Sequence, residues 1–267
     1  MHKKGKFHHN DYDFVHQANG DFRTVEIKEM DGRKVFIKHY HLLTPAQVKA
    51  IYDKYVFFYE RIPQETVRTP EPLSLTDCSI TFAFIDLPEE NRLNHFLVSD
   101  EVTKEAALKR TAENLHILHI VGEEKNYNHG DCGYGNFFLY NEYMCVIDFE
   151  SPPNIQKKMY SDSILYSKEF DLALFNYSLF SLSDRVINGY IANNTKYHDS
   201  FLVAYQAAGG NVNDQRYKKA MWFLLRDTFM SIVKCQRTVW YKVPFHLPLL
   251  IIMILRNKHM RQAVFSR

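Results

Sequence analysis

Glycine, proline and cysteine are all scarce in this chain of 267 residues. Ten Gly and nine Pro are too few for a collagen-like, linker-rich or disordered protein, and 46% of the residues are hydrophobic. The four cysteines include no Cys-x-x-Cys pair and are too few for a disulfide framework, so a reducing, cytoplasmic setting is expected. The composition predicts a folded globular protein with one large domain or two closely packed lobes.

Long apolar segments are also missing. The longest run, residues 247–255, contains Pro248 and is well short of the ~20 residues that a membrane-spanning helix needs. The first ten residues are basic and rich in His, and no apolar stretch follows them. Neither a membrane span nor a secretory signal is therefore expected.

The net charge of +2 conceals an uneven distribution. Residues 215–267 contain eleven Lys or Arg and a single acid, Asp227, which is a local balance of +10, and the first 214 residues carry −8. A basic surface of this kind is expected to attract an anionic partner. Aromatic residues interleave with the basic ones, but no recognised nucleic-acid motif accompanies them, so nucleic acid is not an expected partner.

The N-terminal third has the pattern of a β-sheet with one helix. Alternation from residue 22, a turn at residues 31–32 and strand-like composition up to Tyr40 predict a β-hairpin. A helix is predicted from Pro45, with apolar residues at helical spacing up to Ile62. Two further strands are expected at residues 73–75 and 79–85. Residues 86–90 have the composition of an exposed connector between lobes.

The remaining chain has a mainly helical pattern. A helix is predicted to begin near Ser99 or Asp100, and helices dominate again after Lys168. Between them, residues 136–140 and 143–147 predict a short hairpin. The sequence thus predicts an α+β, bilobal protein. Its small N-terminal β-sheet lobe with one helix spans residues 1–88, and its larger, mainly helical C-terminal lobe spans residues 89–267.

The densest polar cluster lies at residues 128–136, Asn-His-Gly-Asp-Cys-Gly-Tyr-Gly-Asn, and Val-Ile-Asp-Phe-Glu follows at 146–150. Asp131, Asn136 and Asp148 are oxygen ligands or proton acceptors that are expected to converge at the mouth of the predicted hairpin. Such donors suit Mg²⁺, which takes one or two carboxylates or carbonyls and keeps other positions for water and phosphate. Ordinary turn chemistry is the alternative, since Asp, Asn and Gly also terminate hairpins. Both motifs together favour the magnesium site.

This pair of motifs resembles the kinase-like phosphotransferases, whose catalytic loop has an Asp and an Asn five residues later, followed by a hairpin and an Asp-Phe-Gly metal motif. The spacing of Asp131 and Asn136 matches that pattern. His-Gly-Asp in place of His-Arg-Asp, and Ile-Asp-Phe-Glu in place of Asp-Phe-Gly, are similar to the aminoglycoside phosphotransferase and choline kinase group. The resemblance covers about residues 14–235, and it implies a bilobal protein kinase-like fold.

The resemblance implies a role for each residue of the two motifs. Asp131 would accept or orient the proton of an acceptor hydroxyl. Asn136 and Asp148 would hold Mg²⁺ against the phosphates of ATP. Asp171 resembles the buried Asp that holds the catalytic loop through hydrogen bonds, and His129 is expected to be a packed scaffold instead of a general base.

In the first lobe the resemblance is less complete. Lys38, at the end of Val-Phe-Ile-Lys, would contact the α- and β-phosphates. The next helix would supply a carboxylate that anchors Lys38, either Glu60 or Asp53 on nearly the same face, and a solvated Glu60 is an open alternative. The turn expected to cover the phosphates has one glycine, Gly20, in place of a Gly-x-Gly-x-x-Gly fingerprint, and the neighbouring Asp21 would repel phosphate.

The acceptor is expected to be a small molecule or glycan in preference to a protein. Gly130 takes the place of the Arg that pairs with a phosphorylated segment in protein kinases, and no Ala-Pro-Glu follows. The resemblance implies an acceptor cleft beside the C-terminal helices. Their positive charge favours an anionic acceptor, such as a phosphorylated sugar or a lipopolysaccharide-core sugar, over a cationic aminoglycoside or choline.

The sequence allows more than one interpretation of its C-terminal segment and of its function. Apolar residues 245–255 followed by a basic end form either a peripheral contact with the inner face of a membrane or a last core helix with a solvated end. A catalytically silent binding or regulatory module, or a protein kinase, is the alternative to a small-molecule kinase.

Overall fold

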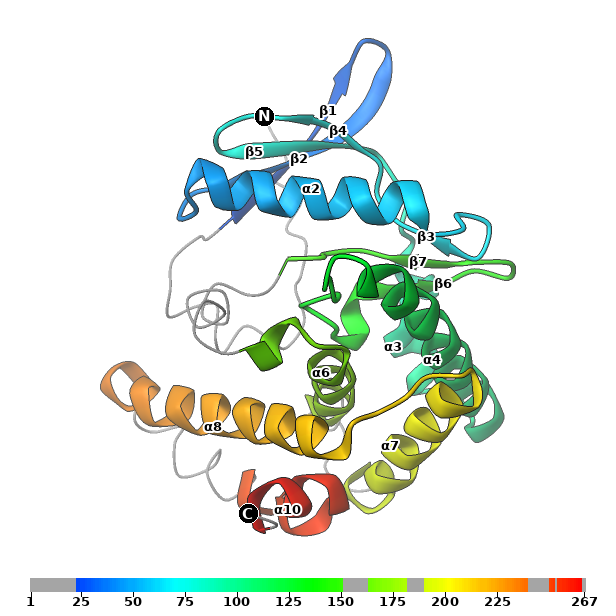
Figure 1. The fold of residues 1–267 in the computed structure, drawn as a ribbon, viewed down its shortest axis with the longest axis vertical. Coiled ribbons are helices and arrows are strands. Elements are labelled where there is room, and N and C mark those ends of the chain that lie inside the picture. The colour runs from blue at the N-terminus through cyan, green and yellow to red at the C-terminus, as the bar shows by residue number, and fades with distance from the viewer. Residues whose placement is uncertain (1–22, 151–162, 182–189, 240–249, 253, 266–267) are drawn as a thin grey trace.

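The computed structural model describes residues 23–150, 163–181, 190–239, 250–252 and 254–265 of the chain. Figure 1 shows a small β-sheet with one long helix at the N-terminal end, and a larger group of helices at the opposite end of the molecule. The predicted α+β class, with a small sheet-containing N-terminal part and a mainly helical remainder, is therefore confirmed.

The first sheet has four antiparallel strands in the order β1-β2-β5-β4. Its strands are β1 (Arg23–Met30), β2 (Arg33–Tyr40), β4 (Pro72–Leu75) and β5 (Ser79–Ala83). The predicted hairpin is present, and Asp31 and Gly32 in its turn have φ angles of 50° and 71°. Two consecutive left-handed residues are what a two-residue type I′ hairpin turn requires, which explains the Asp-Gly pair.

One helix, α2 (Pro45–Arg61), covers this sheet (Figure 1). It begins in a capping box, in which the Thr44 side chain accepts from the backbone N–H of Gln47 and the Gln47 side chain accepts from that of Thr44. The fully buried Val48, Tyr55 and Phe58 form the face that packs inward. This face decides which residues of α2 can reach the strand that carries Lys38.

A second, three-stranded sheet lies between the first sheet and the helices. It has the order β3-β7-β6, from β3 (Val67–Arg68), β6 (Phe137–Leu139) and β7 (Met144–Val146). The hairpin β6–β7 was predicted, whereas the two-residue strand β3 was not, because two residues carry no recognisable alternation. Its parallel pairing with β7 connects the N-terminal part of the chain to the hairpin beside the polar cluster.

The remaining elements are helical. They are η1 (Glu89–Asn91), α3 (Leu93–Leu97), α4 (Glu101–Glu123), η2 (Tyr134–Asn136), η3 (Ser163–Tyr166), α6 (Lys168–Ser181), α7 (Tyr190–Ala207), α8 (Asp214–Val239) and α10 (Lys258–Phe265). Asp100 caps α4 by accepting from the backbone N–H of Thr103, as its position in the sequence predicts. Helix α4 packs against α7, and α6 packs against α8.

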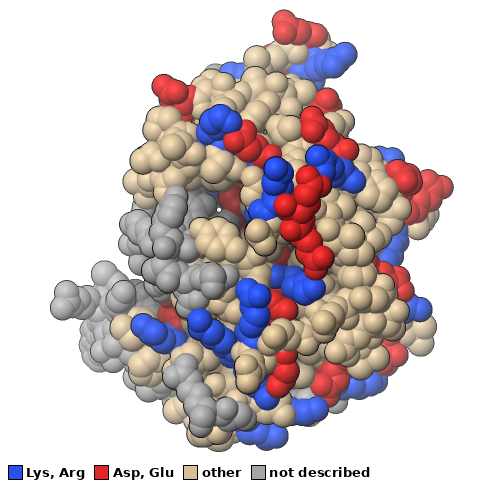
Figure 2. All heavy atoms as spheres, viewed as in Figure 1, with Lys and Arg blue, Asp and Glu red and all other residues tan. Residues whose placement is uncertain are grey.

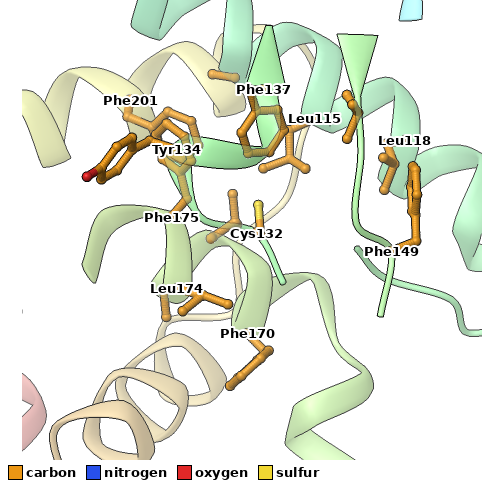
Figure 3. Packing of buried hydrophobic residues seen from close by; sticks show 14 of the residues in the cluster. Leu115, Leu118, Cys132, Tyr134, Phe137, Phe149, Phe170, Leu174, Phe175 and Phe201 are labelled. Carbon is orange, nitrogen blue, oxygen red and sulfur yellow. The ribbon is translucent and has the colours of Figure 1, made fainter. Parts of the chain in front are cut away.

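The apolar neighbours of the polar cluster anchor it to the core. Cys132, Tyr134 and Phe149 are buried, and Figure 3 shows Cys132 within the core and Phe149 beside Leu118 of α4. Because these neighbours are fixed by close packing, the polar side chains between them have little freedom to move.

The C-terminal helix α10 packs against α8 and buries Met260 and Ala263. Of the apolar residues 245–255, residues 245–249 and 253 lie outside the described residues; Leu250 is buried, whereas Ile251, Ile252 and Leu255 are exposed. In the part of the chain that the structure describes, no helix combines the length and apolar character needed to cross a membrane.

Candidate active site

The loop that carries Asp131 is fixed by Asp171 at the start of α6. The Asp171 carboxylate accepts from the backbone N–H groups of His129 and Gly130, the latter at 2.8 Å. It also accepts from the Asn128 side chain at 3.2 Å and contacts His119 Nε2 at 3.1 Å. Burial alone would raise the pKa of Asp171, but the hydrogen bonds outweigh it and lower that pKa. Asp171 thus has the loop-holding geometry that the sequence predicts.

Asp131 and Asn136 lie at the two ends of the turn that follows. The Asn136 side-chain nitrogen donates to the backbone oxygen of Asp131 at 2.8 Å, which closes the turn and leaves the side-chain oxygen of Asn136 as an acceptor. Burial, and next the charge of Asp148, raises the pKa of Asp131 to about 7. A carboxylate with a pKa near neutrality is suited to accept a proton from a substrate hydroxyl.

Asp148 has an unusual backbone conformation. Its φ angle is 61°, in the left-handed region that a non-glycine residue adopts only at an energetic cost. The following residue, Phe149, is fully buried, with its ring 4.9 Å from that of Phe58. Packing of Phe149 therefore maintains the backbone twist that turns the Asp148 carboxylate toward the first sheet. A strained acidic residue held in this way is a candidate functional residue.

Two cations from the first sheet bridge two carboxylates from the loop. Lys38 of β2 donates to Asp148 and, at 2.8 Å, to Glu150. Arg23, the first residue of β1, donates to Asp148 at 2.9 Å and to Glu150 at 2.6 Å. Lys38 is 5% exposed and Glu150 is 3% exposed. Such buried pairs hold the first sheet and the Asp148 loop in one relative position, and removal of one partner is strongly destabilising.

Glu150 also accepts from two tyrosines. The hydroxyl of Tyr55 donates to it at 2.7 Å and that of Tyr40 at 3.2 Å. Burial opposes ionisation of Glu150, but Lys38 and Arg23 outweigh it, so its pKa is lowered. Glu150 is therefore an ionised, buried carboxylate with four donors, and it holds Lys38 in place.

The expectation that Glu60 or Asp53 anchors Lys38 is corrected by this arrangement. Glu60 is exposed, and Asp53 is exposed and pairs with Lys49 at 2.7 Å. The residue of α2 that reaches Lys38 is Tyr55, whose hydroxyl lies 3.2 Å from the ammonium group. At about 100° per residue, a side chain five positions after Tyr55 points about 140° away from the sheet. The carboxylate beside Lys38 comes instead from Glu150.

Four other residues predicted for the site lie close together in the structure. Lys38 contacts Asp148, Asn136 contacts Asp131, and the charge of Asp148 acts on Asp131, so these four residues share one site. Gly20 lies outside the described residues.

His129 is fully buried, and its ring stacks on that of Phe149 with the centroids 4.9 Å apart. Burial lowers its pKa to about 4. His129 is therefore neutral at physiological pH and packed inside the loop, in agreement with the scaffold role expected for it.

The donor set of the site fits a magnesium ion. Asp148 offers a carboxylate and Asn136 offers a side-chain oxygen, which are hard ligands of the kind Mg²⁺ takes in small number. Burial, and next the charge of Asp148, raises the pKa of Asp131, and a divalent cation beside both carboxylates would relieve the repulsion between them.

Several residues of the site carried little signal in the sequence. Arg23 looks like any alternating strand residue, and Tyr55 looks like a core residue of α2. Lys54 did carry a signal, since it interrupts the apolar face formed by Ile51, Tyr55 and Phe58. It donates to the backbone oxygens of His129 and Phe149.

Two solved structures are similar to this chain over most of their length. One is a ternary complex of streptomycin, ATP and APH(2″)-IIa, with 12% identity, a TM-score of 0.36 and coverage of 86% of this chain and 94% of that chain. The other is an aminoglycoside-3′-phosphotransferase of type VIII, with 15% identity, a TM-score of 0.36 and coverage of 79% and 96%. No protein-family model matches the chain, and no curated protein matches it either. The function proposed below rests on the residues of the site.

Proposed function

We propose that this protein is an ATP- and Mg²⁺-dependent phosphotransferase that phosphorylates a hydroxyl group of a small molecule or glycan. One observation carries the proposal: a buried lysine of a central strand, two acids and one amide from separate segments converge on one site. In this proposal residues 1–88 form the nucleotide-binding lobe and residues 89–267 form the catalytic and acceptor-binding lobe.

Each residue has a defined task in this chemistry. Lys38, held by Glu150, would bind the phosphates of the nucleotide. Asn136 and Asp148 would hold Mg²⁺, which would supply charge neutralisation for the transferred phosphoryl group. Asp131 would align the acceptor hydroxyl and take its proton, for which a pKa of about 7 is well matched. No further nucleophile is needed, because this reaction depends on positioning and electrostatic stabilisation.

An anionic acceptor is supported by the charge of α8. This helix carries the exposed Arg216, Lys219 and Arg226. Figure 2 shows several Lys and Arg side chains, with some Asp and Glu among them, on the lower half of the surface in view. Helix α8 packs against α6, which supplies Asp171 to the catalytic loop. A phosphorylated sugar or a lipopolysaccharide-core sugar fits this field better than a cationic acceptor. A cytoplasmic protein with peripheral contact to an anionic membrane surface would meet such an acceptor.

A second candidate, a catalytically silent nucleotide-binding or regulatory module, is favoured by one observation. Two cations of the first sheet, Lys38 and Arg23, are paired with Asp148, the proposed metal ligand. An active enzyme must release part of this pairing when the metal and the nucleotide bind, and a silent module need not.

The test compares ATP turnover in the wild type, Asp131→Asn and Asp148→Asn, with a panel of phosphorylated sugars, glycolipid extracts and cationic aminoglycosides as acceptors. The kinase proposal expects turnover that requires Mg²⁺ and falls at least a hundredfold in both variants. Asp53→Asn is the matched control, because Asp53 is exposed and paired only with Lys49 among the described residues. Nucleotide binding without turnover would select the silent module, and preference for a cationic acceptor would refute the charge argument.

A further inference from the structure

Lys54 lies where the first sheet's helix meets the two loops of the proposed active site. Its ammonium group donates to the backbone oxygen of His129 at 2.9 Å and to that of Phe149 at 2.7 Å. His129 stands two residues before Asp131, and Phe149 directly follows Asp148. A single side chain of α2 therefore links the two loops that carry these acids.

The carbonyl groups that Lys54 binds belong to the residues next to Gly130 and Asp148, which both have a positive φ angle. The His129 oxygen belongs to the peptide that leads into Gly130, whose φ angle is 90°, and the Phe149 oxygen follows Asp148, whose φ angle is 61°. These two residues set the directions of the Asp131 and Asp148 side chains. Fixing these carbonyl groups restrains the backbone within two residues of Asp131 and within one residue of Asp148.

Lys54 is one of several contacts that join these loops, since the His129 ring stacks on that of Phe149 and the backbone N–H of Ile147 donates to the Asn136 oxygen at 3.1 Å. Asp171 binds the amide side of the catalytic loop, from within the helical part of the chain. On the metal loop, the backbone N–H of Phe149 donates to the Tyr55 hydroxyl at 3.1 Å. Consecutive side chains of α2, Lys54 and Tyr55, thus take both the carbonyl and the amide of Phe149. Unlike Tyr55, Lys54 also donates a hydrogen bond to the loop that carries Asp131.

The acidic residues around Lys54 favour a positively charged side chain at this position. Burial lowers the pKa of Lys54 to about 8, and the nearby charges of Asp171, Glu150 and Asp131 oppose that decrease. Hydrogen bonds from an ammonium group to carbonyl oxygens are stronger than those between neutral partners. The acids of the site thus help to keep charged the lysine that aligns them.

We propose that Lys54 is a positioning residue that holds Asp131 and Asp148 at the separation required for phosphoryl transfer. This inference rests on the proposed function and adds a residue to it. Because a misplacement of about 1 Å costs on the order of a hundredfold in rate, Lys54→Met should lower kcat by roughly ten- to a hundredfold. Because Asp148 would also hold Mg²⁺ for the nucleotide, KM for ATP should rise by a smaller factor than kcat falls.

The experiment measures kcat and KM for ATP in Lys54→Met, Lys54→Arg and the control Lys49→Met, which changes an exposed lysine of the same helix. Lys54→Arg keeps the charge and the donors, so it should recover most of the lost kcat, and the control should match wild type. Unchanged kcat in Lys54→Met, or a loss confined to KM, would overturn the inference.

A second measurement does not require activity. Lys54→Met should raise deuterium uptake in peptides that cover both loops, residues 128–136 and 146–150, whereas uptake in α4 should stay as in wild type. If the wild type shows no ATP turnover, the proposed function fails, and this uptake still decides whether Lys54 links the loops. Unchanged deuterium uptake in either loop would overturn the inference. The inference would also fail if none of the Lys54 variants differed from Lys49→Met in kcat or in deuterium uptake. If Lys54→Met does not fold, Lys54→Arg and Lys54→Gln are compared in the same way.

Discussion

Replacing Asp131 by Asn should stabilise the protein while it removes catalysis. The site raises the pKa of the Asp131 carboxyl from 3.8 to about 7, chiefly by burial and next by the charge of Asp148. The folded state therefore binds a proton at Asp131 that the unfolded chain has already released. At neutral pH this carboxylate opposes folding, and a neutral amide of the same shape does not.

The size of the effect follows from the pKa change. A rise from 3.8 to about 7 corresponds to at most about 4 kcal/mol, because a tenfold change in a protonation equilibrium is about 1.4 kcal/mol. Asp131 is partly exposed, and solvent screening reduces this figure, so about 2 kcal/mol is expected. The gain should be complete above pH 7, decrease as the pH falls from 7 to 4, and vanish below the unfolded pKa, where both states are protonated.

The assay is urea unfolding of wild type and Asp131→Asn at pH 8, 6 and 4, with EDTA present so that no divalent cation neutralises the site. Asp53→Asn is the control, because this exposed residue should change the free energy of unfolding by less than about 0.5 kcal/mol. Equal or lower stability of Asp131→Asn at pH 8 would refute the argument. A stability gain that grows as the pH falls would refute it as well.

Three further changes test other contacts of the site. Glu150→Gln should raise KM for ATP about tenfold, since Lys38 loses its anchor, and steady-state kinetics with an unchanged KM would contradict this. Asp171→Asn should lower the free energy of unfolding by about 2–3 kcal/mol, because Asn keeps a single acceptor oxygen and one of the two buried amides that donate to Asp171 loses its partner. Urea unfolding measures this change. Arg23→Gln should tighten Mn²⁺ binding several-fold in electron paramagnetic resonance titrations, because Arg23 no longer competes for Asp148. Weaker Mn²⁺ binding would show that Arg23 supports the site instead.

The sequence predicted the elements that depend on local pattern. Thr44-Pro45 and Asp31-Gly32 have strong positional preferences, so the start of α2 and the hairpin turn were found correctly. The polar cluster was also found, because Asp131, Asn136 and Asp148 stand at recognisable spacings. Local chemistry decides such features, and a single chain shows it directly.

Contacts made by packing could not be found in the same way. The choice between Glu60 and Asp53 depended on the rotation of α2 about its axis, which the sheet sets through Val48, Tyr55 and Phe58. Glu150 became the anchor of Lys38 because the left-handed Asp148 turns the chain at that point, and periodicity does not reveal such a twist. Long-range pairs such as Arg23 with Glu150 depend on the relative position of a strand and a loop far apart in the chain.

The most direct test of the central claim is the effect of Mg²⁺ on nucleotide binding, measured by isothermal titration calorimetry with a non-hydrolysable ATP analogue. The wild type should bind the analogue at least tenfold more tightly with Mg²⁺ than with EDTA, and Asp148→Asn should lose that difference. Absence of binding in both conditions, or equal affinity with and without Mg²⁺ in the wild type, would contradict an ATP- and Mg²⁺-dependent phosphotransferase.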